Sequence, residues 1–248
     1  MRIVISSRRI LRTLLIVQAA LTLAHIAVGT WHHFLRHPDR FGLMRQFSLD
    51  EEANIPTYYA ALLLLAAASL LALIAAAKAR EKDPYRRHWA ALSIVLLYMS
   101  IDEACMIHET WSSYLPSLHR GAGIMHFPWI PVGIAVVALV AVSFIRFFLH
   151  LPRTTRMLMG AAAAAYVAGA LGMEMLAGIL KDVTINQGIS YAMVSTTEEN
   201  LEMLGMALFI FALLSYISEH MPRLELSVSP YGKIPEAETP TDARPELD

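Results

Sequence analysis

The sequence predicts an all-α integral membrane protein built as a bundle of six transmembrane helices. Of its 248 residues, 56% are hydrophobic and only 17% are charged, whereas soluble domains carry about a quarter charged residues. Six apolar segments are long enough to cross a bilayer, whose core of ~30 Å needs about 20 helical residues. Because lipid offers no partner to backbone polar groups, each span must be helical. The spans are expected near residues 10–33, 57–78, 88–110, 127–149, 157–180 and 197–218.

The connecting loops are short, so residues 1–221 are expected to form one transmembrane domain. The first apolar segment is too long for a usual signal peptide and is expected to stay as an uncleaved helix. Residues 222–248 are rich in Pro, Glu and Thr and are expected to form a disordered cytoplasmic tail. Gly and Ala crowd the fifth span, GAAAAAYVAGALG, which favours close packing against neighbouring helices.

The loop charges predict the orientation. Lys and Arg gather at the N-terminus and in the second and fourth loops, and such loops stay on the cytoplasmic side. The first loop is an exception, with three arginines partly balanced by acids. We therefore expect a bacterial inner-membrane protein with both termini in the cytoplasm.

Composition also excludes some classes of function. The net charge is -1, so no basic field predicts nucleic-acid binding. Cys105 is the single cysteine, which excludes an intrachain disulfide and any cysteine-rich metal site. The expected surroundings are the lipid bilayer and, as one possibility, partner membrane subunits.

With this orientation, polar residues from four spans share one depth. At 1.5 Å per residue, His25, Asp102, Glu174 and Glu202 all fall in the outer third of the bilayer. Ionisable residues at such depth usually face a partner, a cavity or a metal. The first loop ends in LDEEANIPTYY, which adds acidic residues and Asn54 just above this layer.

Two helices show polar or small stripes that are expected to face each other. The stripe of the first span contains Gln18, Thr22 and His25, and that of the third contains Tyr98, Asp102, Cys105 and Glu109. The acids of the third span lie at its C-terminal end, where the helix dipole disfavours negative charge. Something in the fold must compensate for them.

The leading hypothesis is a metal site, because histidine with several carboxylates suits zinc, iron or manganese. The sequence contains no HExxH motif, so the hypothesis depends on residue types gathered at one depth. The expected ligands are His25, Asp102, His108, Glu109 and Glu174, with Glu103 or Glu202 as general base for a metal-bound water. Glu198, Glu51, Glu52 and Asn54 are expected nearby.

Structural interpretations compete with this hypothesis. Ser195 and Thr196, each followed three residues later by a glutamate, form capping boxes that explain Glu198 and Glu199 at a helix start. His25 could hydrogen-bond to a neighbouring helix. The acids of the first loop, Asp50, Glu51 and Glu52, could be a solvated cap above the second span.

Three motifs, LDEEANIPTYY, SIDEACMIHE and EENLEMLG, resemble those of a group of multi-pass membrane proteins from bacterial genomes. The resemblance covers most of residues 40–218 and implies a bacterial inner membrane, but it implies no activity. Whether the chain is an enzyme stays open. The most concrete hypothesis is a metal-dependent enzyme acting on a lipid or another amphiphile at the periplasmic face. The alternatives are a non-enzymatic subunit, whose acids pair with basic residues of a partner, and an ion or proton-coupled transporter.

Overall fold

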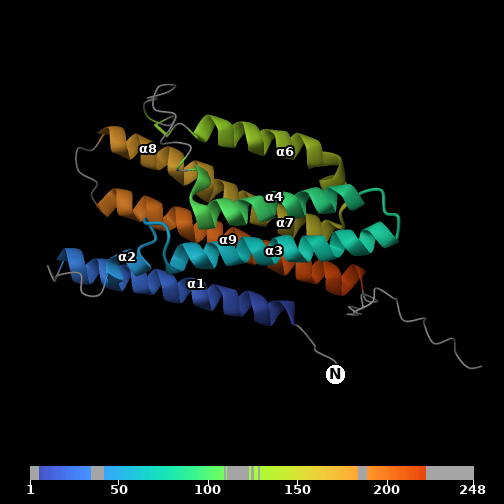
Figure 1. The fold of residues 1–248 in the computed structure, drawn as a ribbon, viewed down its shortest axis with the longest axis horizontal. Coiled ribbons are helices and arrows are strands. Elements are labelled where there is room, and N and C mark those ends of the chain that lie inside the picture. Colours follow the sequence, from blue (N-terminus) through green and yellow to red (C-terminus); the bar gives the residue numbers. More distant parts are fainter. Residues whose placement is uncertain are drawn as a thin grey trace, which may run out of the picture.

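The computed structural model describes residues 6–34, 42–108, 110, 123, 126–127, 129–183 and 189–221. Within these residues the chain forms helices and no strands, as predicted (Figure 1). The predicted tail, 222–248, lies outside the described residues. The elements are α1 (Ser7–Gly29), η1 (Thr30–Phe34), α2 (Leu43–Phe47), α3 (Ile55–Arg80), α4 (Arg86–Cys105), α6 (Ile130–His150), α7 (Arg153–Val167), η3 (Ala168–Met173), α8 (Glu174–Val183) and α9 (Ile189–His220).

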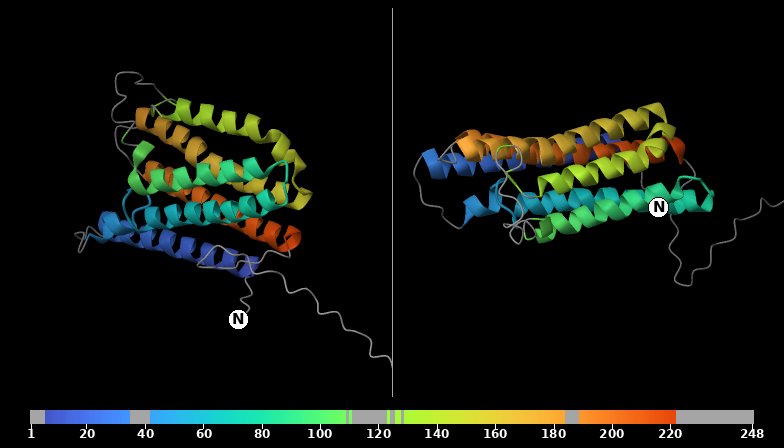
Figure 2. Two further views of the ribbon diagram at one scale, coloured as in Figure 1. Left: turned by 45° about the vertical axis from the view of Figure 1, so that its right-hand side comes forward. Right: turned by 90° about the horizontal axis from the view of Figure 1, so that it is seen from above.

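The long helices run side by side in an elongated bundle (Figure 2). α9 lies at its centre and packs against α1, α3 and α7, while α3 and α4 form an antiparallel pair. α6 lies at the edge, beside η3. α7, η3 and α8 continue one another, and η3 is a π-helical segment within this run.

Five helices are long and apolar enough to cross a membrane: Ser7–His32, Ile55–Arg80, Ile130–His150, Arg153–Lys181 and Ile189–His220. This finding supports a membrane protein. α4 runs antiparallel to α3, and its 20 residues match the length of a span. Its hydropathy is lowered by His88, Asp102 and Glu103, which explains why α4 is not among the five.

Two helix boundaries differ from those expected. α4 ends at Cys105 instead of residue 110, because Met106 takes the left-handed conformation (φ 52°) and its N–H donates to the carbonyl of Asp102. α9 begins at Ile189, eight residues before the expected start at 197. Ser195 and Thr196 therefore lie inside α9, so the predicted capping boxes are wrong.

The α7–α9 packing confirms the role expected of small residues. A Cβ atom added at Gly205 would lie 2.8 Å from the backbone nitrogen of Tyr166 and 2.9 Å from the carbonyl oxygen of Ala162. The two helices thus touch backbone to backbone. The large buried side chains are apolar and lie mainly on α3, α4, α6 and α9: Leu64, Leu71, Ile74, Trp89, Ile130, Phe147, Met203 and Leu213.

Candidate functional site: an acidic cluster at one end of the bundle

Acidic side chains gather where α3 begins and α4 ends, beside the third and fourth turns of α9. Glu202 lies within electrostatic range of Glu103 and Glu174, and Glu199 within range of Glu103 and Glu52. We call the following set the acidic cluster: Glu52 before α3, Asp102 and Glu103 on α4, Glu174 on α8, and Glu198, Glu199 and Glu202 on α9. The structure thus brings together Asp102, Glu174 and Glu202, three of the four residues that the sequence placed at one depth.

A small enclosed space lies within the cluster. Glu103, Glu202 and Tyr166 line it together with apolar side chains of α3 and α9, and its volume of about 10 Å³ suits about one water molecule. So many carboxyl groups in a poorly solvated site cannot all be ionised without a compensating positive charge. The cluster therefore needs protons or a cation.

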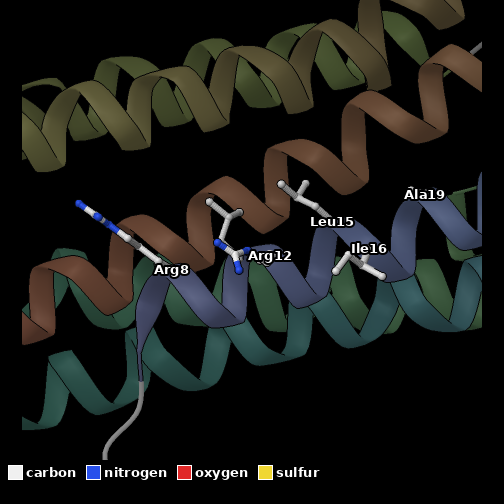
Figure 3. A pocket seen from close by; sticks show the side chains of 6 residues that line it. Arg8, Arg12, Leu15, Ile16 and Ala19 are labelled. Carbon is white, nitrogen blue, oxygen red and sulfur yellow. The ribbon is translucent and has the colours of Figure 1, made fainter.

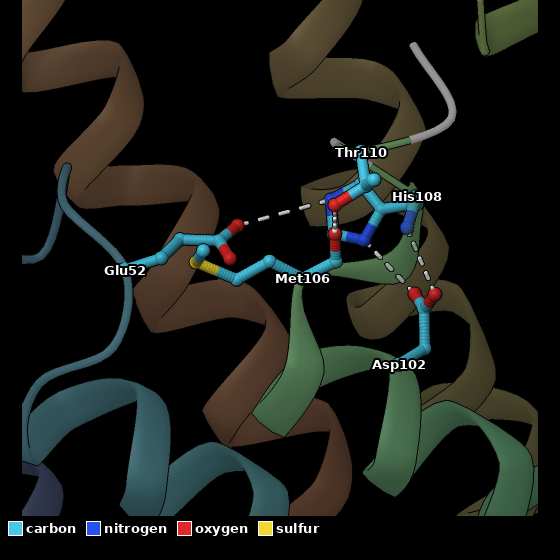
Figure 4. Close-up of polar contacts among 5 residues, drawn as sticks. All are labelled: Glu52, Asp102, Met106, His108 and Thr110. Atoms are coloured by element: carbon cyan, nitrogen blue, oxygen red, sulfur yellow. Dashed lines mark hydrogen bonds and ion pairs between the residues drawn. The ribbon is translucent and has the colours of Figure 1, made fainter. Parts of the chain in front are cut away.

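His108 supplies positive charge to this end of the bundle (Figure 4). Its backbone N–H donates to Asp102 Oδ1 at 3.0 Å, and its ring Nδ1 lies 2.9 Å from Asp102 Oδ2. The other ring nitrogen, Nε2, lies 3.8 Å from Glu52 Oε1. The hydrogen bond to Asp102 is the main cause that raises the pKa of His108 from 6.5 to about 9. Burial opposes the rise, and the charges of Asp102, Glu52 and Glu103 add to it.

The break in α4 makes this contact possible. Residues six apart along a continuous helix lie far apart and on different faces. Because Met106 adopts a left-handed conformation, the chain turns back and places His108 over Asp102. The acid that looked unfavourable at a helix C-terminus thus pairs with a cationic imidazole.

The structure does not bring His25 into the acidic cluster. Its Nδ1 accepts a hydrogen bond from the backbone N–H of Leu49 at 3.1 Å, and its Nε2 lies 3.1 Å from Thr196 Oγ1. His25 therefore joins α1, the first loop and α9. This arrangement matches the hydrogen-bonding alternative.

The stripe expected on the first span faces α9. Asn200 accepts hydrogen bonds at Oδ1 from Gln18 Nε2 (3.1 Å) and Thr22 Oγ1 (2.8 Å), and Gln18 also donates to the Asn200 carbonyl at 2.8 Å. We did not identify Asn200 from the sequence. The available signal was its position four residues after Thr196, on the same face of α9.

The stripe expected on the third span is wrong at two of its four residues. Tyr98 and Cys105 are exposed, and α4 instead turns Ser93 and Ser100 toward α3. Ser93 Oγ donates to the carbonyl of Ala68 and Ser100 Oγ to that of Ala61, both at 2.8 Å. These contacts place Glu103, rather than Cys105, at the inner surface.

The first loop is held by specific contacts. Asn54 is the N-cap of α3: its Oδ1 accepts from the Thr57 backbone N–H, and its Nδ2 donates to the carbonyls of Ser48 and Glu51. Asp50 Oδ1 accepts from Ser195 Oγ of α9 at 2.7 Å. Glu51 is exposed. Asn54 therefore has a structural role. Asp50 and Glu51 are both exposed, but Asp50 is also tied to α9.

The other polar residues near this end of the bundle lie as follows. Glu198 lies within electrostatic range of Glu174, and it is placed within α9 rather than at its start. Lys181 lies against aromatic rings, 4.5 Å from the centroid of Phe127 and 5.0 Å from that of Tyr191. Glu109 lies outside the described residues. Among the described residues, no three His, Cys, Asp or Glu side chains are placed to hold one metal ion.

Comparisons with known proteins identify a family. A family model described as a domain of unknown function (DUF8692) matches residues 13–217, a range that takes in most of the helical bundle. No curated protein and no solved structure matches the chain.

Proposed function

We propose that the chain, which belongs to the DUF8692 family, is a metal-dependent membrane enzyme that acts on a lipid or another amphiphile. In this proposal it crosses the bacterial inner membrane six times, with α4 as a span in addition to the five long apolar helices, and both termini are cytoplasmic. The acidic cluster then lies toward the periplasmic face. Zinc, iron and manganese are the candidate metals.

The Asp102–His108 pair is the observation that supports the proposal most strongly. Metal-binding histidines commonly direct one ring nitrogen to a carboxylate, which fixes the ring and leaves the other nitrogen for the metal. His108 has this arrangement, because Nδ1 meets Asp102 while Nε2 points toward Glu52 (Figure 4). We therefore assign Asp102 a positioning role rather than the ligand role expected from the sequence.

The assigned ligands are Glu52 and Nε2 of His108, which would release its proton when the metal binds, with Glu103 beside them. Glu103 and Glu202 line the small enclosed space and remain the candidates for a general base. Binding an ion requires these glutamate side chains to rotate together, since the described residues contain no preformed set of three. A cation would also relieve the repulsion within the cluster.

Metal analysis of the purified protein tests the proposal. We expect about one transition-metal ion per chain, a rise in melting temperature when Zn²⁺ or Mn²⁺ is added to the chelated protein, and loss of both in His108→Gln and Glu52→Gln. Glu51→Gln is the matched control, because Glu51 is exposed in the same loop. Metal-free protein whose melting temperature responds to neither ion excludes the metal site.

A second measurement tests the enzymatic part. Wild-type protein loaded with the bound metal is incubated with phospholipid vesicles, and the lipids are analysed by mass spectrometry. We expect new lipid products that disappear in Glu202→Gln while metal content is kept. Metal binding without any product restricts the protein to a metal-binding role.

Little in the opposite half of the bundle favours the transporter alternative. Ser93, a polar side chain of that half, is satisfied locally, because its Oγ donates to the carbonyl of Ala68. Between this contact and the acidic cluster lie the buried apolar residues Leu64 and Ala67 of α3. These contacts favour a site that works at one face of the membrane.

A further inference from the structure

A shallow groove, widely open to the surroundings, runs along one face of α1 at the end opposite the acidic cluster. It has a volume of about 410 Å³, and its walls come from one face of the helix. Two arginines, Arg8 and Arg12, lie at its mouth (Figure 3). The remaining lining residues are Leu11, Leu15, Ile16 and Ala19.

We infer that this groove binds one anionic phospholipid, with the phosphate at Arg8 and Arg12 and an acyl chain along the apolar residues. Arg8 and Arg12 are one helical turn apart, so both side chains can reach one phosphate group. Guanidinium groups bind phosphate oxygens with paired hydrogen bonds. The inference is independent of the proposed enzymatic function.

The electrostatics of the helix start favour an anion. The first turn of α1 contains no acidic residue, and Ser6 at the N-cap makes no side-chain capping bond. The positive end of the helix dipole therefore lies beside the arginines without a compensating charge. Among the described residues, no carboxylate forms an ion pair with Arg8 or Arg12.

The length of the groove matches a lipid rather than a free phosphate ion. From Arg8 to Ala19 the helix rises about 16 Å, and one leaflet of the hydrocarbon core is about 15 Å thick. Ile16 and Ala19 are exposed, so an acyl chain can lie against them. The small side chain of Ala19 keeps the deep end of the groove open.

Lipid retention by the full-length protein, measured by native mass spectrometry from detergent, tests the inference. The probes are phosphatidylglycerol, which is anionic, and phosphatidylcholine, which carries no net charge. We expect wild type to retain phosphatidylglycerol preferentially. A basic residue near a membrane surface contributes about fivefold in affinity for anionic lipid, so Arg8→Gln and Arg12→Gln should each lower retention by roughly that factor.

Arg9→Gln is the matched control, because Arg9 is exposed on the same turn but does not line the groove. It should leave retention within about twofold of wild type, since the same charge is removed from another face. Ala19→Leu should lower retention by filling the groove, whereas Ala20→Leu, at an exposed neighbouring position, should not. Glycerol phosphate should fail to displace the bound lipid.

Three outcomes overturn the inference. If all three arginine variants lose phosphatidylglycerol retention equally, the attraction comes from diffuse charge. If wild type retains both lipids equally, the contact is unselective. Displacement by glycerol phosphate indicates a phosphate site without a lipid groove. Melting temperatures of the variants, expected to match wild type, show that the comparison is made on folded protein.

Discussion

At the scale of single residues, Asp102 and His108 explain how α4 tolerates acids at its C-terminal end. A helix C-terminus carries partial negative charge, so a carboxylate there needs a cationic partner. His108 is that partner because two hydrogen bonds tie it to Asp102. The sequence showed that acids stand at the unfavourable end of this helix. The contact that compensates for Asp102 depends on the left-handed conformation of Met106, which no local sequence pattern indicates.

Asp102→Asn should destabilise the metal-free protein. Asparagine keeps an oxygen for the backbone N–H of His108 but loses the carboxylate that meets the ring. Hydrogen bonds to charged groups contribute about 1.5–3 kcal/mol, so the melting temperature should fall, and Asp102→Ala should lower it further. Thermal unfolding in detergent with a chelator measures both, and Glu51→Gln serves as the unaffected control.

The same pair predicts a pH dependence. Because folding raises the pKa of His108 from 6.5 to about 9, the pair stabilises the protein fully below pH 6.5 and loses this effect as the pH rises through 9. The gap in melting temperature between wild type and Asp102→Asn should therefore narrow between pH 7 and 10. A gap that stays constant over this range contradicts a charged His108.

At the scale of secondary-structure elements, the path of α9 decides which residues share the site. α9 begins at Ile189, so Glu198 and Glu199 lie in its third turn and not at its first. The serine and threonine before them bond to Asp50 and His25 instead of capping a helix. Periodicity predicted the existence of this helix, but its start depends on tertiary contacts that a local capping pattern cannot reveal.

Gly169 keeps space for the cluster. A Cβ atom there would lie 2.8 Å from the carbonyl oxygen of Glu198 and 2.9 Å from Glu202 Cγ. Gly169→Ala should cost about 1–3 kcal/mol through overpacking. Gly172 of the same π-helical segment has nothing within 4 Å, so Gly172→Ala should be neutral or slightly stabilising. Melting temperatures of the two variants provide the test, and equal values refute the close contact.

Asn200 connects α9 with α1. Asn200→Ala removes the Oδ1 acceptor for Gln18 and Thr22. Hydrogen bonds between membrane helices contribute about 0.6 kcal/mol each, and at most about 1.7, so we expect a loss of roughly 1–2 kcal/mol. Thr197→Ala is the control, because Thr197 is exposed and bonds within its own helix. A smaller effect at Asn200 than at Thr197 would falsify the assigned connection.

At the scale of the whole molecule, the helical membrane fold was the most predictable feature. Long apolar segments have only one solution in lipid, which is a helix, and five described helices meet the criteria for spans. Side-chain partners were less predictable. The polar face of α1 followed from spacing, whereas that of α4 did not, because Ser93 and Ser100 compete with Tyr98 and Cys105 for the inner surface.

The proposed orientation can be tested with single cysteines. In a Cys105→Ser background, Glu51→Cys should react with a membrane-impermeant maleimide in intact cells. Lys82→Cys, in the loop between α3 and α4, should react only after the cells are opened. Both positions are exposed, so access depends on the side of the membrane alone. The opposite pattern places both termini outside.

The 32 residues of α9 have a further consequence. At 1.5 Å per residue such a helix is about 48 Å long, well beyond a hydrocarbon core of ~30 Å. Its first turns stay apolar and exposed at Ile189 and Met193, so they gain from lipid contact. A long apolar helix meets this mismatch by tilting or by thickening the bilayer around it. The thickness of the bilayer thus affects the tilt of the helix that carries Glu198, Glu199 and Glu202.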